Sequence, residues 1–380
     1  MKISKNFRKG CVLALAGLLA IPCLSLMRTQ AAGEIDVDAR CSLTVSVDKT
    51  VLMEGEAAGN ETLLQYKDDF AKVEIPVSIY RVAQVDAVGK YTGIDAFQGM
   101  DFTKLSSETT AADWMTLAEE AKGLLDGAQT KPEAAGTEHV KTAGSGSTAT
   151  ATFTDLDTGL YLVVPEATFN EMYTAKYVFT PYLTALPGNP YATGGGTGDD
   201  AYGTGEDRWE YDTTIGLKAA VEPQVGKLIV TKTLSNFNET LGCVSFVFEI
   251  IGRDTDGTVV YQNIISTTHD TADTQSVTED IPAGCYVTVT EVYDGPSYTY
   301  DSPTIVSDLY IWSDAAIEAK EKGEGGAAIE NAAIPVAPFV NRYDEGNRGG
   351  YGVTNQFERD EDGGWKWTTS IPVTPAPEAE

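Results

Sequence analysis

Three short stretches of alternating residues constrain the fold of this chain more than any other feature. They are residues 226–234, 284–291 and 338–343, and each sets β-branched or aromatic residues between polar ones. A period-two pattern bounded by turn residues predicts a strand with one face toward a core. In each strand the alternate residues that are mostly apolar include one polar residue. These polar residues are Lys232, Glu291 and Asn341, one in each strand. If these phases face inward, three polar groups enter an apolar core, an arrangement that proteins normally avoid or neutralise.

A reaction among these three side chains would remove that cost. An amine kept neutral by burial is a nucleophile, and a carboxamide can lose ammonia to it. A buried carboxyl group has a raised pKa, stays protonated and can carry a proton between the two. The pattern therefore predicts a neutral amide between Lys232 and Asn341, assisted by Glu291, that joins the first of the three strands to the last.

The residues around this trio also resemble a known family. The tripeptides that carry the likeness are, in chain order, Val-Thr-Lys at 230–232, Val-Thr-Glu at 289–291 and Phe-Val-Asn at 339–341. They resemble the collagen-adhesin B-type (CnaB-like, SpaA-type) domain of Gram-positive pilin subunits. The resemblance implies an autocatalytic isopeptide bond between Lys232 and Asn341, with Glu291 assisting and with no cofactor, metal or external substrate. The other interpretation is a plain β-sandwich with ordinary polar residues at its strand edges.

Composition narrows the class of protein further. A net charge of -29 opposes binding to nucleic acid or to anionic membranes, because like charges repel. The chain of 380 residues is 42% hydrophobic, which suits two domains with real cores. The two histidines, His139 and His269, stand in polar, loop-like surroundings and supply a zinc site or a Ser-His-Asp triad poorly. We therefore expect an all-β chain of two tandem immunoglobulin-like (CnaB-like) sandwiches, the first with a helical insertion.

The chain divides into four expected segments. Basic residues before an apolar run, followed by small residues, are typical of a signal peptide, so the protein is expected to be secreted or held at the cell surface. The final residues contain no wall-sorting pentapeptide, which departs from the pilin family. The expected segments are a signal peptide at 1–32, a pilin-type sandwich at 33–222, a CnaB-like sandwich at 223–345, and a hairpin with a disordered tail at 346–380.

The first expected sandwich contains two irregular regions. Trp114, Leu117, Ala121 and Leu124 recur at helical intervals and predict a helix between residues 106 and 125. Residues 131–150 are rich in glycine, serine and threonine and are expected to form a mobile loop.

An internal repeat links the two expected sandwiches. Four residues of the first half match four of the second at a constant offset, namely Leu156, Gly159, Tyr161 and Glu166 with Ile281, Gly284, Tyr286 and Glu291. The repeat indicates two versions of one fold. A second bond from Lys49 to Asp212, with Glu166 assisting, is conceivable, but we favour no bond in the first domain.

Two further sites depend on the resemblance or on the oxidising compartment. Lys218 ends the strand-like segment 209–218 where pilins carry the lysine that a sortase joins to the next subunit, although Leu217 replaces the usual proline. The alternative is a solvated linker residue. Cys243 and Cys285 share a domain, but their phases differ, so the alternation leaves a disulfide between them open.

The resemblance implies a structural subunit that polymerises with other pilin subunits through a sortase. Two alternatives stay open. The chain can be a secreted adhesin for a host glycan or protein, using Trp365 and Trp367 of the C-terminal hairpin. It can also be the non-catalytic β-module of a secreted glycosidase.

Overall fold

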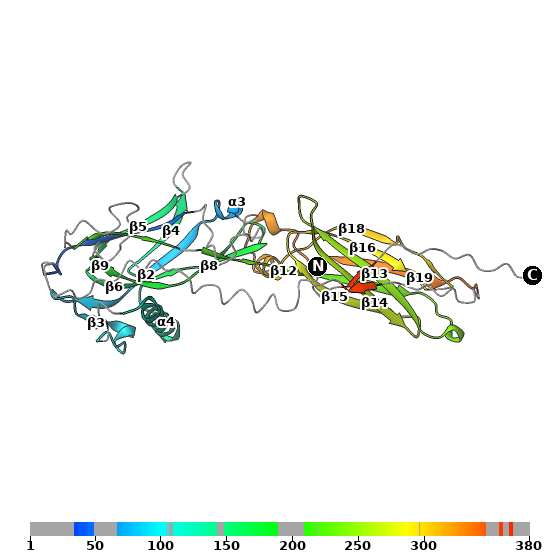
Figure 1. Ribbon diagram of the computed structural model, residues 1–380, viewed down its shortest axis with the longest axis horizontal. Helices are drawn as coiled ribbons and strands as arrows, with labels where there is room; N and C mark the ends of the chain where they lie inside the picture. Colours follow the sequence, from blue (N-terminus) through cyan, green and yellow to red (C-terminus); the bar gives the residue numbers. More distant parts are fainter. Residues whose placement is uncertain are drawn as a thin grey trace, which may run out of the picture. The chain divides into compact units, whose positions relative to one another are not determined.

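The computed structural model describes most of the chain beyond the expected signal peptide. The described residues are 34–48, 67–103, 105, 109–142, 148–188, 209–217, 219–295, 297–346, 357–359 and 365–367. They form two compact units, which divide between Glu222 and Pro223, with Glu171–Thr174 grouped with the second unit. Strands dominate both units, so the expected all-β class is confirmed (Figure 1). Among the described residues no helix is both long and apolar enough to span a membrane.

The second unit is a sandwich of two four-stranded sheets. One sheet has the order β15-β12-β19-β17 and the other β14-β13-β16-β18. The strands are β12 (Val225–Leu234), β13 (Val244–Arg253), β14 (Val259–His269), β15 (Thr274–Pro282), β16 (Tyr286–Tyr293), β17 (Tyr298–Tyr300), β18 (Ile305–Tyr310) and β19 (Val336–Tyr343).

Apolar side chains from both sheets fill the space between them. Buried and half-buried residues alternate strictly along β12 and β13, as expected for strands with one face on the core. The core includes Phe246 and Phe248 of β13, Val289 of β16 and Phe339 of β19. Burial of such large side chains contributes about 1.5–3 kcal/mol each.

The first unit folds the same kind of ladder into one larger sheet. Its path is β10-β1-β5-β4-β2-β6-β9, with β3 paired to β2, and a three-stranded sheet β11-β8-β7 accompanies it. The strands are β1 (Cys41–Asp48), β2 (Ile75–Val85), β3 (Tyr91–Gly93), β4 (Gly136–Thr142), β5 (Thr148–Leu156), β6 (Gly159–Pro165), β7 (Thr168–Phe169), β8 (Ala175–Phe179), β9 (Tyr182–Leu186), β10 (Asp212–Gly216) and β11 (Ala219–Pro223).

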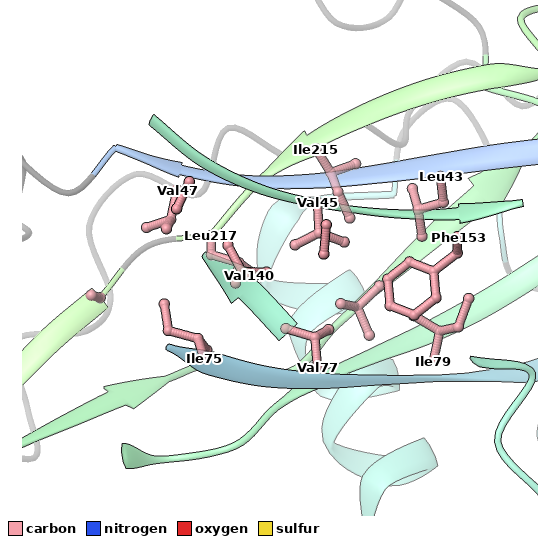
Figure 2. Close-up of a cluster of buried hydrophobic side chains, with 14 of the residues drawn as sticks. Leu43, Val45, Val47, Ile75, Val77, Ile79, Val140, Phe153, Ile215 and Leu217 are labelled. Atoms are coloured by element: carbon pink, nitrogen blue, oxygen red, sulfur yellow. The ribbon is translucent and has the colours of Figure 1, made fainter. Parts of the chain in front are cut away.

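The core of the first unit lies between the β1 and β2 halves of this sheet. Figure 2 shows the side chains of β1 directed toward those of β2, with an aromatic ring from β5 between them. The labelled residues are Leu43, Val45, Val47, Ile75, Val77, Ile79, Val140, Phe153, Ile215 and Leu217. All of the labelled side chains are apolar.

The expected helical insertion is present as α4 (Ala111–Gly127). Thr110 caps it, because its side chain accepts a hydrogen bond from the Asp113 amide while the Asp113 carboxylate accepts from the Thr110 amide. Trp114 and Ala121 pack onto Leu160 of β6 in a second apolar cluster. Figure 1 shows α4 beside β6, which therefore has covered side chains on both faces.

The loop expected at residues 131–150 is wrong in part. Residues 136–142 form β4, which pairs with β2, and β5 begins at Thr148. Val140 is fully buried, and threonine favours strands, so a stretch that looked like linker by composition completes the sheet. Pairing between β4 and β5 also joins the two layers of the first unit into one sheet.

The two units share their strand pairing. In each, the first strand pairs antiparallel with one strand and parallel with a strand from near the end of the unit: β1 with β5 and β10, and β12 with β15 and β19. β2 pairs with β6 as β13 pairs with β16. The internal repeat seen in the sequence therefore corresponds to one topology used twice.

The remaining elements are short. They are α3 (Lys67–Phe70), η1 (Asp95–Phe97), η3 (Glu239–Leu241), α5 (Asp314–Glu321), η4 (Ala327–Ile329) and the hairpin of β20 (Phe357–Arg359) with β21 (Trp365–Trp367). The expected C-terminal hairpin is thus present. Its side chains lie outside the described part of the structure, as do residues 1–33.

Candidate functional site

Lys232, in the first of the three alternating strands of the second unit, lies in the middle of a sheet. Lys232 of β12 is paired with Gln275 of β15 on one side and with Phe339 of β19 on the other. Its alternation phase is that of Leu228 and Val230, so its side chain enters the core and is fully buried. A neutral or partnered amine is required at such a place, because an isolated buried charge is very costly.

A glutamate and an asparagine from two other strands meet this lysine. Glu291 comes from β16 in the opposite sheet, and Asn341 comes from β19. The Lys232 Nζ lies 2.6 Å from Oε1 of Glu291, and the Asn341 Nδ2 donates to the same Oε1 over 2.9 Å. All three side chains are buried. We call Lys232, Glu291 and Asn341 the buried triad.

Two oxygen atoms of the buried triad have no hydrogen-bond partner among the described residues. They are Oε2 of Glu291 and Oδ1 of Asn341. Buried acceptors without a donor cost about 1–3 kcal/mol each. A protonated Glu291 carries a hydroxyl that can donate to the amide oxygen, and the oxygen and nitrogen of a carboxamide exchange places by a simple flip. The arrangement therefore favours a neutral carboxyl group.

Aromatic rings surround the amine. The Lys232 Nζ lies 4.2 Å from the ring centroid of Phe246 and 5.7 Å from that of Phe248. The ring of Phe339 packs on Phe248 with centroids 4.9 Å apart. This apolar environment excludes water from the amine on the side away from Glu291.

Burial shifts the pKa of both ionisable members toward neutrality. Desolvation lowers the pKa of Lys232, against the opposing effect of the hydrogen bond and the charge of Glu291. Desolvation raises the pKa of Glu291, against the opposing effect of Lys232 and the hydrogen bond from Asn341. Both directions favour a neutral amine beside a protonated carboxyl group.

In this state the buried triad has the groups needed for amide formation. The Lys232 nitrogen can attack the Asn341 Cγ while Glu291 polarises the amide oxygen. The new Nζ–Cγ bond forms, the Cγ–Nδ2 bond breaks, and the proton lost by the amine reaches the departing nitrogen through the Glu291 carboxyl group. The product is one side-chain amide and one molecule of ammonia. The bond would join β12 to β19, the first and last strands of the sandwich.

A second carboxyl group stands near the triad and was not found by sequence reasoning. Asp294 follows β16, and its charge acts on the pKa of both Lys232 and Glu291. Desolvation raises the pKa of Asp294, and burial raises the pKa of Tyr300 to about 12. Asp294 stands in a turn after the alternating strand, so periodicity offered no signal for it.

The first unit does not assemble a matching site. Glu166 is exposed, and so is Asp212, which accepts a hydrogen bond from the Ser42 hydroxyl over 2.6 Å. Lys49 lies outside the described residues. Asp212 is paired with Ser42 near the start of β1. A bond between Lys49 and Asp212 is therefore not tested by the described residues.

The structure answers one question that the sequence left open and corrects one expectation about a side chain. Cys243 and Cys285 are both free, and no disulfide joins them. They lie at opposite ends of β13, because Cys243 precedes its first residue while the Cys285 Sγ lies beside Gly252. His269 is not in a polar loop but is the last residue of β14, fully buried and hydrogen-bonded to Asp273 and Thr267.

Lys218 lies outside the described residues. Leu217, which precedes it, is buried and its amide donates to the Ser46 carbonyl. Within the described residues no group of histidine, cysteine and acidic side chains is arranged to hold a metal ion.

Comparison with known proteins gives likenesses among solved structures alone. No family model matches the chain, and no curated protein matches it. The structure is similar to the shaft pilin SpaA of Lactobacillus rhamnosus GG, with 11% identity, a TM-score of 0.23, and coverage of 83% of this chain and 100% of that one. It is also similar to the major pilin SpaD of Corynebacterium diphtheriae, with 14% identity, a TM-score of 0.25, and coverage of 82% and 99%.

The Bacillus anthracis TIE protein is similar too, at 11% identity and a TM-score of 0.30, with coverage of 80% of this chain and 34% of that protein. At such low identity and TM-scores these likenesses carry no inference about the site. The chemistry of the buried triad has to be judged from its own geometry.

Proposed function

We propose that this protein is a secreted, pilin-type structural subunit whose second unit closes itself with an isopeptide bond between Lys232 and Asn341. The observation that carries the proposal is the single Glu291 oxygen in contact with both the amine and the carboxamide inside an apolar core. Few other roles account for three buried polar side chains on three strands, because apolar residues would stabilise the sandwich without partners.

A bond at this place has a mechanical consequence. β12 and β19 are neighbouring parallel strands at the two ends of the unit's sequence. Force applied through the chain ends pulls these strands along their length and shears the hydrogen bonds between them. A covalent link between the two carries the load past the rest of the sandwich. A subunit of an extracellular fibre has a use for this property, and a soluble enzyme module has little.

The proposed assembly adds a second lysine. We place the intermolecular cross-link at Lys218, on the basis of its position after the strand-like segment that ends the first unit. Sortase-catalysed joining to another pilin subunit would make this chain a polymerising subunit. The alternative, a secreted adhesin, requires that the protein bind a host glycan or protein. A glycan array with the purified protein distinguishes a glycan-binding adhesin from a shaft subunit.

Intact-mass measurement of the purified protein tests the bond. The wild type is expected to be lighter than its sequence by one ammonia, and Glu291→Ala is expected to show the full mass. Glu166→Ala is the matched control, because Glu166 is the sequence repeat of Glu291 but is exposed. Tandem mass spectrometry should place the lost ammonia on a cross-linked pair of peptides that contain Lys232 and Asn341. An unmodified mass for folded wild type would contradict the proposal.

Incubation with a sortase and a peptide that bears its sorting motif tests the assembly. Conjugation at Lys218 that disappears in Lys218→Ala, but persists in Lys227→Ala, supports a polymerising subunit. Conjugates scattered over several lysines would count against it.

A further inference from the structure

The buried triad lies beside an edge of the sandwich. Asn341 belongs to β19, and the strand next to β19 is β17, which has three residues and no further neighbour in its sheet. An edge strand this short leaves the space between the two sheets open to water unless side chains cover it. Water in this space would reverse the desolvation on which the triad depends.

Tyr300 is placed to cover this edge. It is paired with Asn341 across β17 and β19. Directly opposite residues of an antiparallel pair extend from the same face of the sheet, so Tyr300 and Asn341 share the core face. Tyr298, two residues earlier, shares that face as well and is buried against Tyr343. Tyr300 is 38% exposed, which puts it at the boundary between core and solvent.

Asp294 stands near the buried triad on the side of the other sheet. It directly follows β16, the strand that supplies Glu291. The charged and titratable groups that face Asp294 are Lys232 of β12, Glu291 of β16 and Tyr300 of β17.

We propose that Tyr300 forms a lid over the buried triad and keeps water out of it. Tyr300 is a positioning residue, because it takes no part in bond making or breaking. Its role rests on the proposed isopeptide chemistry, which needs a neutral amine. Each pKa unit that solvent restores to Lys232 lowers its neutral fraction about tenfold.

The rate of ammonia loss tests the lid. The full chain is synthesised in a cell-free system at several pH values, quenched in denaturing acid at set times, and analysed by intact mass. Tyr300→Ala is expected to slow ammonia loss about tenfold or more near neutral pH and to regain the rate at alkaline pH, because solvation raises the pKa of the lysine. If Tyr300→Ala only loosened packing, the protein would be less stable but the pH dependence of the rate of ammonia loss would be unchanged.

A conservative variant tests the ring itself. Tyr300→Phe keeps the ring and is expected to be slowed less than Tyr300→Ala. Tyr286→Ala is the matched control, because Tyr286 is 48% exposed at the far end of β16. A Tyr300→Ala protein with the rate and pH profile of this control would overturn the lid.

A second measurement does not need the bond. In an Asn341→Ala background no amide can form, and an amine-reactive reagent reports the exposure of Lys232. Labelling of Lys232 should be slow in this background and fast when Tyr300→Ala is added. If Lys232 remains protected, the lid is wrong. If labelling responds as expected but wild type retains its ammonia, the lid stands and the isopeptide proposal falls.

Discussion

The two units use one pattern of strand pairing but place different residues at matching positions. Six residues after the matched pairs Cys41–Leu156 and Gly226–Ile281, the first strands carry Val47 and Lys232. Counted from Ile215 and Ala337, the position of Asn341 corresponds to Ala219, which lies beyond the end of β10 and begins β11. Both Val47 and Ala219 are buried, as Figure 2 shows for Val47 and its apolar neighbours.

The third position does not follow the sequence repeat. The constant offset in the sequence matches Glu166 with Glu291, but the two residues differ in burial. Glu291 is buried, whereas Glu166 is exposed and the residue before it, Pro165, is buried. Tyr161 and Tyr286 diverge in the same way, since the first is 1% exposed and the second 48%.

The comparison shows that this topology does not need polar residues in its core. The first unit builds the same ladder with Val47 and Ala219, and both lie in its apolar core. The second unit accepts the desolvation of a lysine and an asparagine at those positions and of Glu291 beside them. A buried ion pair is often no more stabilising than apolar residues of similar volume, so retention of the triad indicates a chemical role.

The largest expected effect comes from Glu291→Ala. This change leaves Lys232 buried without a partner, which costs about 3–5 kcal/mol. It also prevents the cross-link, and closure of a loop on the order of 100 residues is worth about 5 kcal/mol in the chain-entropy model. Hydrogen exchange with mass spectrometry should show the loss in the second unit and an unchanged first unit. Glu291→Gln controls for packing. Equal hydrogen-exchange protection of the second unit in wild type, Glu291→Ala and Glu291→Gln would contradict the role given to Glu291.

The reverse change in the first unit should be the next largest. Val47→Lys puts an amine where no carboxylate or carboxamide has a matching position, and an uncompensated buried charge costs about 3–5 kcal/mol. The first unit should lose protection in hydrogen exchange, and the intact mass should show no loss of ammonia beyond that of wild type. Val47→Met is the apolar control. Loss of a second ammonia in Val47→Lys would mean that the first unit has a partner within reach.

A smaller effect is expected when the second unit receives apolar residues like those of the first. The triple variant Lys232→Met, Glu291→Met, Asn341→Leu removes the cross-link but also removes the desolvation of polar groups, which is worth about 1–4 kcal/mol. Its free energy of unfolding should be lower than that of wild type by about 1–4 kcal/mol. The triple variant should therefore be more stable than Glu291→Ala. Chemical denaturation followed by hydrogen exchange measures it. A triple variant less stable than Glu291→Ala would contradict this account of the core.

The smallest effect concerns α4, which only the first unit carries on the outer face of its sheet. Thr110→Ala removes an N-cap and should cost the first unit about 1 kcal/mol. Hydrogen bonds from Thr110 lower the pKa of Asp113, so this contribution is present above the ordinary carboxyl pKa and is lost as the pH falls through the lowered value. Thermal unfolding at acidic and neutral pH should show this dependence in wild type and a smaller one in Thr110→Ala, which keeps the backbone hydrogen bond to Asp113.

Local periodicity determined much of the second unit from the sequence alone. Alternation along three strands was enough to turn Lys232, Glu291 and Asn341 inward, because successive side chains of a strand point to opposite faces. Helical spacing around Trp114 likewise predicted α4, which begins at Ala111. The all-β class and the repeated topology followed from the same local patterns.

Only the tertiary structure decided which groups meet and which do not. The sequence could not show that one oxygen of Glu291 contacts both partners, because this depends on how two sheets pack. It also matched Glu166 with Glu291, although a shift of one residue turns a side chain from the core to the solvent. The positions of Asp294 and Tyr300 depend on a turn and an edge strand, where no periodicity operates. Contacts between strands far apart in the chain arise from packing, and a single sequence carries no local signal for them.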